Sequence, residues 1–136
     1  MDKDTVLLIL NEKWNCSLPF GWIPITSDEA IPNVEIYNST YFDYYIEGIK
    51  EIIKNKFKVN QILEIGEDGH FRELNIDDCG FYYDGLEYIY TDKNFDLVLY
   101  FSHETATTIG GRELLAELHK IWPENIKHLW TPLQNN

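Results

Sequence analysis

The chain has 136 residues and a formal net charge of −12, because 23 Asp and Glu outnumber 11 Lys and Arg. This charge has the same sign as a nucleic acid backbone or an anionic lipid surface, so it argues against unaided binding to either and favours a cationic partner. Hydrophobic residues make up 44% of the chain, far above the content of disordered chains. We therefore expect a single folded domain spanning residues 1–136.

Cysteine usage and the N-terminal sequence both predict a cytoplasmic protein. Cys16 and Cys79 are too few and too far apart to form a disulfide framework, and neither belongs to a CxxC pair. The apolar run 6–10 is too short for a membrane span, and no basic region precedes it as in a signal peptide. We expect reduced thiols, no membrane contact and a location in the cytoplasm.

The first third of the chain offers one ambiguous element and one connecting segment. Asp4 can cap a short helix that ends near Lys13, with apolar residues at helical spacing. Residues 6–10 could equally form a buried strand, because they are continuously apolar. Residues 18–33 contain three prolines, whose fixed backbone angles exclude regular helix and predict a connection.

The middle of the chain changes from a helical to a strand pattern. Apolar residues recur every three or four positions over 41–57, and the capping residues 38–40 precede them, so a helix is predicted there. Beyond residue 57 the apolar residues alternate with polar ones, which is the pattern of a β-strand. Strands are therefore expected at 59–65 and 70–76, joined by a glycine-containing hairpin.

A second pair of strands and a second helix follow. Strands are expected at 86–91 and 95–101 around a short polar turn, and the second is apolar enough for a central place in the sheet. Two glycines then precede 112–122, where one apolar face predicts a helix that Pro123 ends.

These elements predict an α+β fold. We expect an antiparallel sheet of four to five strands between about residues 59 and 109, with the two main helices packed on one of its faces and the N-terminal segment closing an edge. The two helices should then supply core side chains. Four of these are Ile49, Ile53, Leu115 and Leu118.

Residues 77–104 carry a dense mixture of carboxylates and aromatic rings. Seven acids and one base leave a formal charge of −6 there, half of the total. Rings supply contact area and carboxylates steer a cationic partner, so we predict that this stretch binds a basic protein. The expected partner-binding residues are Asp77, Asp78, Tyr82, Tyr83, Asp84, Glu87, Tyr88, Tyr90, Asp92, His103 and Glu104.

A purely structural interpretation of the same strands stays open. In it, alternate side chains of 95–101 face the core and the others take the opposite side. The core set would be Phe95, Leu97, Leu99 and Phe101, and the opposite set Asp96, Val98 and Tyr100. This interpretation needs no partner, yet it leaves large side chains of 86–91 on a surface of the kind that often marks an interface.

No stretch of the sequence demands catalysis or a metal. His103 and Glu104 directly follow an apolar strand, where a histidine beside a carboxylate can serve as a base. Adjacent strand residues point to opposite faces, so the simpler expectation is that His103 bonds a neighbouring backbone group. The histidines lack zinc-ligand spacing, and the acids of 77–84 lack the order of a calcium loop. We expect no catalytic residue, metal or cofactor.

One tract resembles a known family. GLEYIYTDKNFDLVLYFSHE, a tyrosine-rich strand, a turn and a strand ending in His-Glu, is followed by a helix as in the C-terminal half of SUKH (SMI1/KNR4-like) bacterial immunity proteins. The resemblance covers residues 86–122 and implies a protein that neutralises a basic toxin such as a nuclease. The segment LPFGWIPI departs from that superfamily, in which LP is followed by a helix and an Asn-Gly-Gly turn, so no family residue set is transferred.

Three classes of function follow from the sequence. The first is a non-enzymatic acidic protein-binding domain, in its most concrete form an immunity protein. The alternative is a small enzyme or ligand-binding domain with an aromatic pocket around Trp22, Tyr83, Tyr88 and His103. The third is a structural domain with no ligand.

Overall fold

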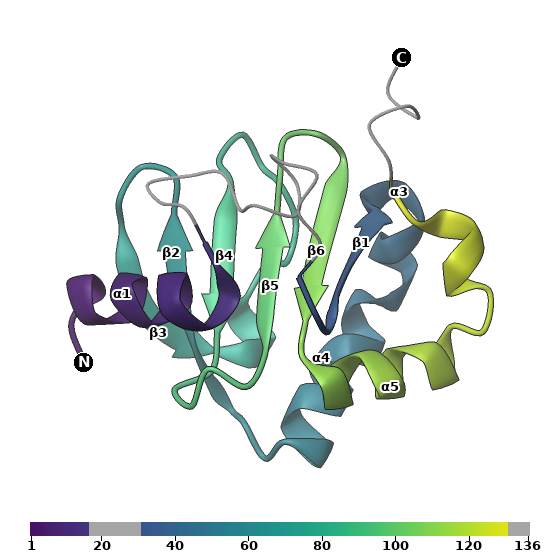
Figure 1. Cartoon of the computed structure of the whole chain (residues 1–136), viewed down its shortest axis with the longest axis horizontal. Coiled ribbons are helices and arrows are strands. Elements are labelled where there is room, and N and C mark those ends of the chain that lie inside the picture. Colours follow the sequence, from purple (N-terminus) through teal and green to yellow (C-terminus); the bar gives the residue numbers. More distant parts are fainter. Residues whose placement is uncertain (17–30, 131–136) are drawn as a thin grey trace.

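The computed structural model describes residues 1–16 and 31–130, and Figure 1 shows a sheet with helices on both faces. The helices of ten or more residues in these ranges are α1 (Lys3–Trp14), α4 (Ile46–Lys56) and α5 (Arg112–Ile121). The strands are β1 (Val34–Asn38), β2 (Gln61–Gly66), β3 (Phe71–Asn75), β4 (Tyr88–Thr91), β5 (Val98–Phe101) and β6 (Ala106–Gly110). Short helical turns are α3 (Ser39–Phe42), η1 (Asp43–Tyr45), η2 (Ile76–Asp78) and η3 (Asn125–His128).

The six strands lie in the order β1-β6-β5-β4-β2-β3, and every neighbouring pair is antiparallel. The predicted α+β class is confirmed, whereas the predicted count of four to five strands is too low. Strand β1 lies outside the range 59–109 predicted for the sheet. Its five residues pair with β6, where Asn38 lies opposite Ala106, and no local pattern signals a pairing over that separation.

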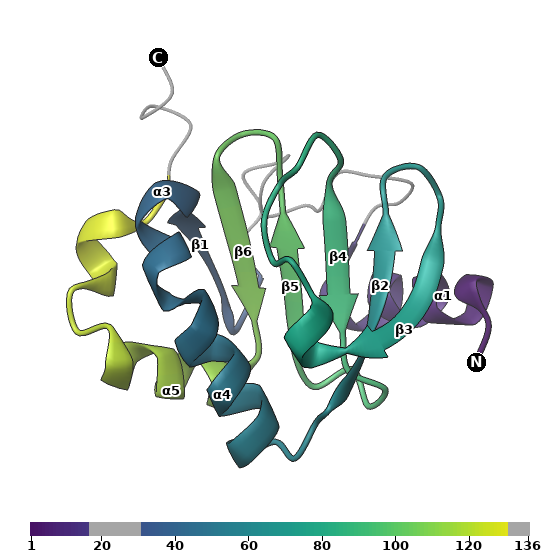
Figure 2. The same ribbon diagram turned by 180° about the vertical axis from the view of Figure 1, so that it is seen from behind.

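The two predicted helices pack on the same face of the sheet, as expected (Figure 2). The four expected core residues of these helices are all buried: Ile49, Ile53, Leu115 and Leu118. The segment 41–57 is not one continuous helix, however. Tyr45 has φ −110° and ψ 3°, outside the helical region, so α4 begins only at Ile46 and is preceded by α3 and η1.

The N-terminal segment is a helix, and it covers the other face of the sheet instead of closing an edge (Figure 1). Val6, Leu10 and Trp14 recur every four residues and form a buried stripe. The side chain of Asp2, not that of Asp4, caps the helix by accepting a hydrogen bond from the backbone N–H of Thr5 at 2.8 Å.

Because helices cover both faces, both sets of alternating side chains on β5 are buried. Leu99 and Phe101 face α4 and α5, while Val98 and Tyr100 face α1. Val98 and Tyr100 do take the opposite side of the sheet, and α1 covers that side. Phe95 also packs beneath α1, contrary to the predicted core set, because its backbone turns through φ 59° before the strand begins.

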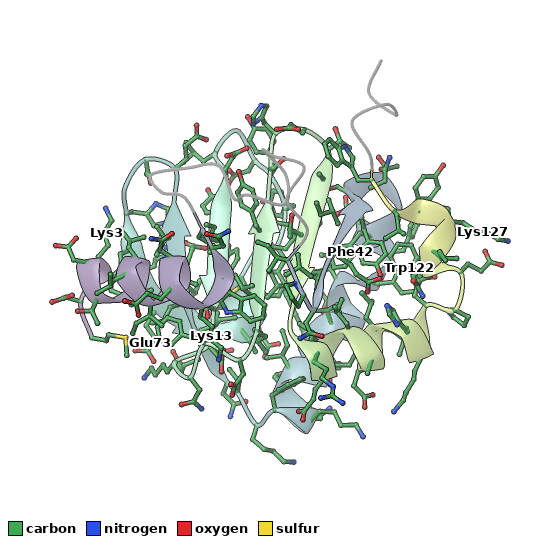
Figure 3. All side chains as sticks on the ribbon, in the orientation of Figure 1. Lys3, Lys13, Phe42, Glu73, Trp122 and Lys127 are labelled. Carbon is green, nitrogen blue, oxygen red and sulfur yellow. The ribbon has the colours of Figure 1, made fainter. Side chains whose placement is uncertain are left out.

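An aromatic contact fixes the short helix α3 against α5. Phe42 is fully buried, and its ring centroid lies 6.3 Å from that of Trp122 in an edge-on arrangement (Figure 3). Tyr37 packs on the same indole at 5.0 Å. Ser39, at the start of α3, is thereby held next to the start of β6, where its N–H donates to the carbonyl of Thr105.

Both cysteines are free thiols inside the protein. Cys16 and Cys79 are buried, and burial raises the pKa of each thiol to about 12. Such thiols stay protonated and unreactive at neutral pH. Of the helices in 1–16 and 31–130, none has the length and apolar character that crossing a bilayer requires.

Candidate functional site

A strained aromatic residue anchors the segment between β3 and β4. Phe81 has φ 54°, a backbone conformation that bulky residues rarely adopt, and its side chain is fully buried. Its ring stacks on Phe101 at 5.5 Å and meets the edge of Tyr90 at 4.8 Å. These contacts hold the strained backbone in place, and strain of this kind often accompanies ligand-binding segments.

Two lysines of α4 tie the same segment to the helix. The Nζ of Lys50, which is 6% exposed, donates to the carbonyl of Cys79 at 2.7 Å. The Nζ of Lys54 donates to Asp77 at 2.8 Å. On the far side of Phe81, the hydroxyl of Tyr88 donates to the carboxylate of Asp84 at 2.8–2.9 Å.

The fixed ends leave the middle of the segment pointing outward. Tyr82 is 53% exposed and Tyr83 is 43% exposed, although large aromatic residues are usually better buried. We call residues 77–84 the acidic-aromatic loop. It presents two neighbouring tyrosines among the exposed carboxylates of Asp77, Asp78 and Asp84.

A buried carboxylate holds His103 beside this loop. Glu87 is 5% exposed; its Oε1 accepts the hydroxyl of Tyr100 at 2.6 Å. Its Oε2 accepts the backbone N–H of His103 at 3.0 Å and lies 2.5 Å from that residue's ring Nδ1. The hydrogen bond to Glu87 raises the pKa of His103, and the nearby charges of Glu104 and Glu67 raise it further. The expectation that the ring bonds a backbone group is therefore wrong.

A pocket of about 310 Å³ opens next to His103. The acidic-aromatic loop, the start of α3 with η1, and the turn between β5 and β6 form its walls. The lining residues are Ser39, Asp43, Tyr82, Tyr83, Phe101, Ser102, His103 and Thr105. Thr105 has φ 60°, an unusual conformation for a β-branched residue, and its carbonyl accepts the N–H of Ser39 at 2.9 Å.

Asp43 brings an unpaired carboxylate to the pocket. Asp43 is exposed, and partial desolvation of its carboxylate raises its pKa. No Lys, Arg or His among the described residues lies within ion-pair distance of it. The neighbouring hydroxyl of Ser39 bonds Thr107 instead, at 2.8 Å.

The structure brings some of the predicted partner-binding residues together and separates others. Those at or beside the pocket are Tyr82, Tyr83, Glu87, His103 and Glu104. Three more lie exposed on the acidic-aromatic loop, namely Asp77, Asp78 and Asp84, and Tyr88 is half-buried at the start of β4. Glu87, Tyr90 and Asp92 are 5%, 2% and 3% exposed, so their side chains lie inside the protein and not on the contact surface predicted for them.

Tyr90 and Asp92 have internal partners instead. The hydroxyl of Tyr90 donates to Glu64 at 2.5 Å. The carboxylate of Asp92 accepts the backbone N–H groups of Asp96 and Leu97 at 2.8 and 3.1 Å, which closes the turn between β4 and β5. Both residues therefore serve the fold.

The predicted aromatic pocket is partly present. Tyr83 and His103 line the pocket, with their ring centroids 6.4 Å apart, whereas Tyr88 does not line it. Trp22 lies outside the described residues. Sequence reasoning missed Asp43 and Thr105. Asp43 reaches the pocket only through the pairing of β1 with β6, whereas Thr105 lies in the β5–β6 turn, where no motif marks it.

One carboxylate fixes the orientation of the His103 ring. Glu87 holds the Nδ1 side of the His103 ring, and no hydroxyl or thiol of the described residues lies within hydrogen-bond distance of either ring nitrogen. In residues 1–16 and 31–130, no group of three His, Cys, Asp or Glu could hold a metal ion.

Comparison with known proteins identifies no relative of this chain. The chain matches no family model, and neither a curated protein nor a solved structure is significantly similar to it. The resemblance of residues 86–122 to SUKH immunity proteins thus stays a prediction.

Proposed function

We propose that this protein is a non-enzymatic binding domain whose acidic-aromatic loop contacts a basic protein. The exposure of Tyr82 and Tyr83 on a loop anchored at both ends carries this proposal. Tyrosines are common among the residues that dominate binding energy at interfaces. A loop that is already ordered loses little conformational entropy when a partner docks, so more of the contact energy remains for affinity.

Charge supports the same choice of partner. Asp77, Asp78 and Asp84 are exposed beside the tyrosines, and the whole chain carries −12. Like-signed surfaces would be repelled, whereas a basic protein would be steered toward the loop. Lys54 offsets only one of these three carboxylates.

The most specific form of the proposal is an immunity protein that neutralises a basic toxin such as a nuclease, as the SUKH resemblance implies. We also propose that the protein works in the cytoplasm. Its two buried, free cysteines suit a reducing compartment, in which thiols persist without pairing.

A matched pair of tyrosine variants tests the loop. Partners captured from an extract of the native cells by the full chain would be identified, purified and titrated against Tyr82→Ala and Tyr44→Ala. Tyr44 is the control because it is 83% exposed on η1, outside the loop. We expect a basic partner whose affinity falls about tenfold or more with Tyr82→Ala and less than about twofold with Tyr44→Ala.

The outcome that contradicts the proposal is equally concrete. Equal binding by both variants, or a partner with a net negative charge, would show that the acidic-aromatic loop is not the contact surface. Association rates at low and high salt give a second reading. If exposed charges steer the partner, the association rate should fall about tenfold or more between 0.1 M and 1 M salt. The reason is that the Debye length shortens from about 10 Å to about 3 Å over that range.

The pocket favours a second candidate, a small enzyme or ligand-binding domain. Its volume lies at the lower end of the range of about 300–1,000 Å³ for small-molecule sites, and it contains an oriented histidine. A screen of small metabolites by thermal shift would support this candidate if a hit stabilised the wild type but not Tyr83→Ala. Stabilisation of both proteins by every hit would count against the pocket.

A further inference from the structure

We propose that the pocket between the acidic-aromatic loop, η1 and the β5–β6 turn receives the guanidinium group of an arginine from the basic partner. This inference rests on the proposed function, because it names the group that the partner inserts. It goes further in assigning the central role to Asp43, a residue outside the loop, and in choosing arginine among cationic side chains.

The charges around the pocket favour a cation. Asp43 contributes a carboxylate with no described counter-ion, so a bound cation would not have to displace a native ion pair. A proton on His103 would be balanced by Glu87 at 2.5 Å. Glu104 and Glu67 add further negative charge near that ring. The pocket therefore carries net negative charge whether His103 is protonated or neutral.

The rings that line the pocket favour arginine over lysine. Tyr82, Tyr83 and Phe101 contribute aromatic walls. A guanidinium group is planar and weakly hydrated, so it stacks on aromatic faces while donating two parallel hydrogen bonds to a carboxylate such as that of Asp43. An ammonium group is a compact, strongly hydrated charge and cannot make both contacts in this way.

The pocket walls are fixed before any ligand enters. Phe81, directly before Tyr82, is locked in a strained conformation by Phe101, and Thr105 is strained in the opposite wall. The N–H of Ser39 donates to the carbonyl of Thr105, which joins α3 to that wall. Preformed walls reduce the entropic cost of gripping a side chain. Two strained residues bordering one pocket are also what a binding site is expected to show.

A pair of short peptides tests the ligand directly. The probes are acetyl-Gly-Arg-Gly-amide and the same peptide with citrulline, which has nearly the same shape and no charge. Each is titrated into the ¹⁵N-labelled full chain and followed by NMR. We expect the arginine peptide to shift the backbone signals of Tyr82, Tyr83 and His103, and to bind about tenfold more tightly than the citrulline peptide.

Matched carboxylate variants test the site. Asp43→Asn removes one negative charge from the pocket lining and is not expected to unfold the protein, because Asp43 is exposed and joins no described ion pair. Asp78→Asn removes an equal charge from the loop outside the pocket lining. We expect Asp43→Asn to weaken the arginine peptide about tenfold, and Asp78→Asn less than about twofold. Melting curves of both variants check that each is folded.

Several results would overturn the inference. They are the lack of any shift with the arginine peptide at tens of millimolar, equal affinity of the citrulline peptide, and equal losses in the two variants. Stronger shifts of the same signals by inorganic phosphate would also overturn it, since the pocket would then be an anion site.

The purified partner separates this inference from the proposed function. If Tyr82→Ala weakens the partner and Asp43→Asn does not, the loop binds the partner and the pocket inference fails. If the arginine peptide enters the pocket but Tyr82→Ala and Tyr44→Ala bind the partner equally, the pocket stands and the loop proposal fails.

Discussion

Two buried carboxylates in this protein have similar partners and different surroundings. Glu64 on β2 and Glu87 before β4 each accept a tyrosine hydroxyl, at 2.5 and 2.6 Å, and each lies within 2.7 Å of a histidine ring nitrogen. Glu64 also accepts the Nε of Arg72 at 2.7 Å, a group that stays charged at all relevant pH values. Glu87 has no such partner among the described residues and borders a pocket through His103.

The two carboxylates differ in the partner that neutralises them: Arg72 for Glu64 and His103 for Glu87. Burial by itself would raise the pKa of Glu64, but hydrogen bonds from Tyr90, Arg72 and His70 outweigh it and lower the pKa. This carboxylate is charged at neutral pH and accepts hydrogen bonds from Tyr90, Arg72 and His70, which suits a structural link between β2, β3 and β4. Glu87 relies instead on a histidine that is 62% exposed and able to titrate.

Removing Glu64 should give the largest loss of stability. Glu64→Ala leaves Tyr90 and Arg72 without their acceptor, and we expect about 3 kcal/mol less free energy of unfolding. Urea denaturation measures it. The control is Glu73→Ala, whose side chain is 39% exposed beside Lys93 and should cost less than about 1 kcal/mol. Similar losses in both variants would remove the structural role assigned to Glu64.

Glu87→Gln should have a smaller effect on stability and a specific effect on His103. We expect a loss of about 1–2 kcal/mol, because the amide keeps part of the hydrogen bonding to Tyr100. The pKa of His103, followed by NMR, should fall, because the hydrogen bond to the Glu87 carboxylate is the main cause of its raised value. Glu104→Gln should lower that pKa less. An unchanged pKa in Glu87→Gln would show that the pair does not form in solution.

The two clusters should respond to pH in opposite directions. The folded pKa of His103 is raised above 6.5, so the stability from its pairing is fully present below about pH 6.5 and disappears as pH rises through the folded value. The folded pKa of Glu64 is lowered below 4.5, so its contribution is present above about pH 4.5 and is lost as pH falls through the folded value.

Stability differences measured across pH check this contrast. The difference between wild type and His103→Ala should shrink between about pH 6 and pH 9, and the His103 part should be small because the ring is mostly exposed. The difference between wild type and Glu64→Gln should shrink below about pH 4.5. If both differences changed over the same pH range, the contrast between the clusters would be lost.

The smallest expected effect is that of chelation. Protein donors satisfy both carboxylates, and no group of three ligands occurs in residues 1–16 and 31–130. EDTA should therefore leave the melting temperature unchanged. If EDTA lowered the melting temperature and one divalent ion restored it, a bound cation would be neutralising Glu64 or Glu87 in place of the protein donors.

The sequence predicts the elements that depend on local pattern. The helices 41–57 and 112–122 show one apolar face, and their core residues Ile49 and Leu118 are buried as predicted. The burial of Tyr100 could not be predicted, because it depends on α1 covering that face of the sheet. Tyr90 is buried on the opposite face, where Phe81 from the acidic-aromatic loop packs on it. Local patterns cannot show which distant helix covers a sheet.

The candidate site divides in the same way. Composition alone indicates the acidic-aromatic loop, since its tyrosines and acids adjoin in the chain. Asp43 could not be found, because nothing in its neighbourhood links it to His103, which is 60 positions later by residue number. Similarly, the adjacency of His103 and Glu104 suggests a pair, yet the ring bonds Glu87 across the sheet end.

The pairing of β1 with β6 has a consequence for the order in which the protein folds. The hairpins β2–β3 and β5–β6 join neighbouring segments, whereas β1 must find a strand that is synthesised much later. Closing so long a loop is slow, so we expect β1 to dock late. The wall that carries Asp43 would arrive with it, and a chain emerging from the ribosome would lack a complete pocket until almost all of its sheet had formed.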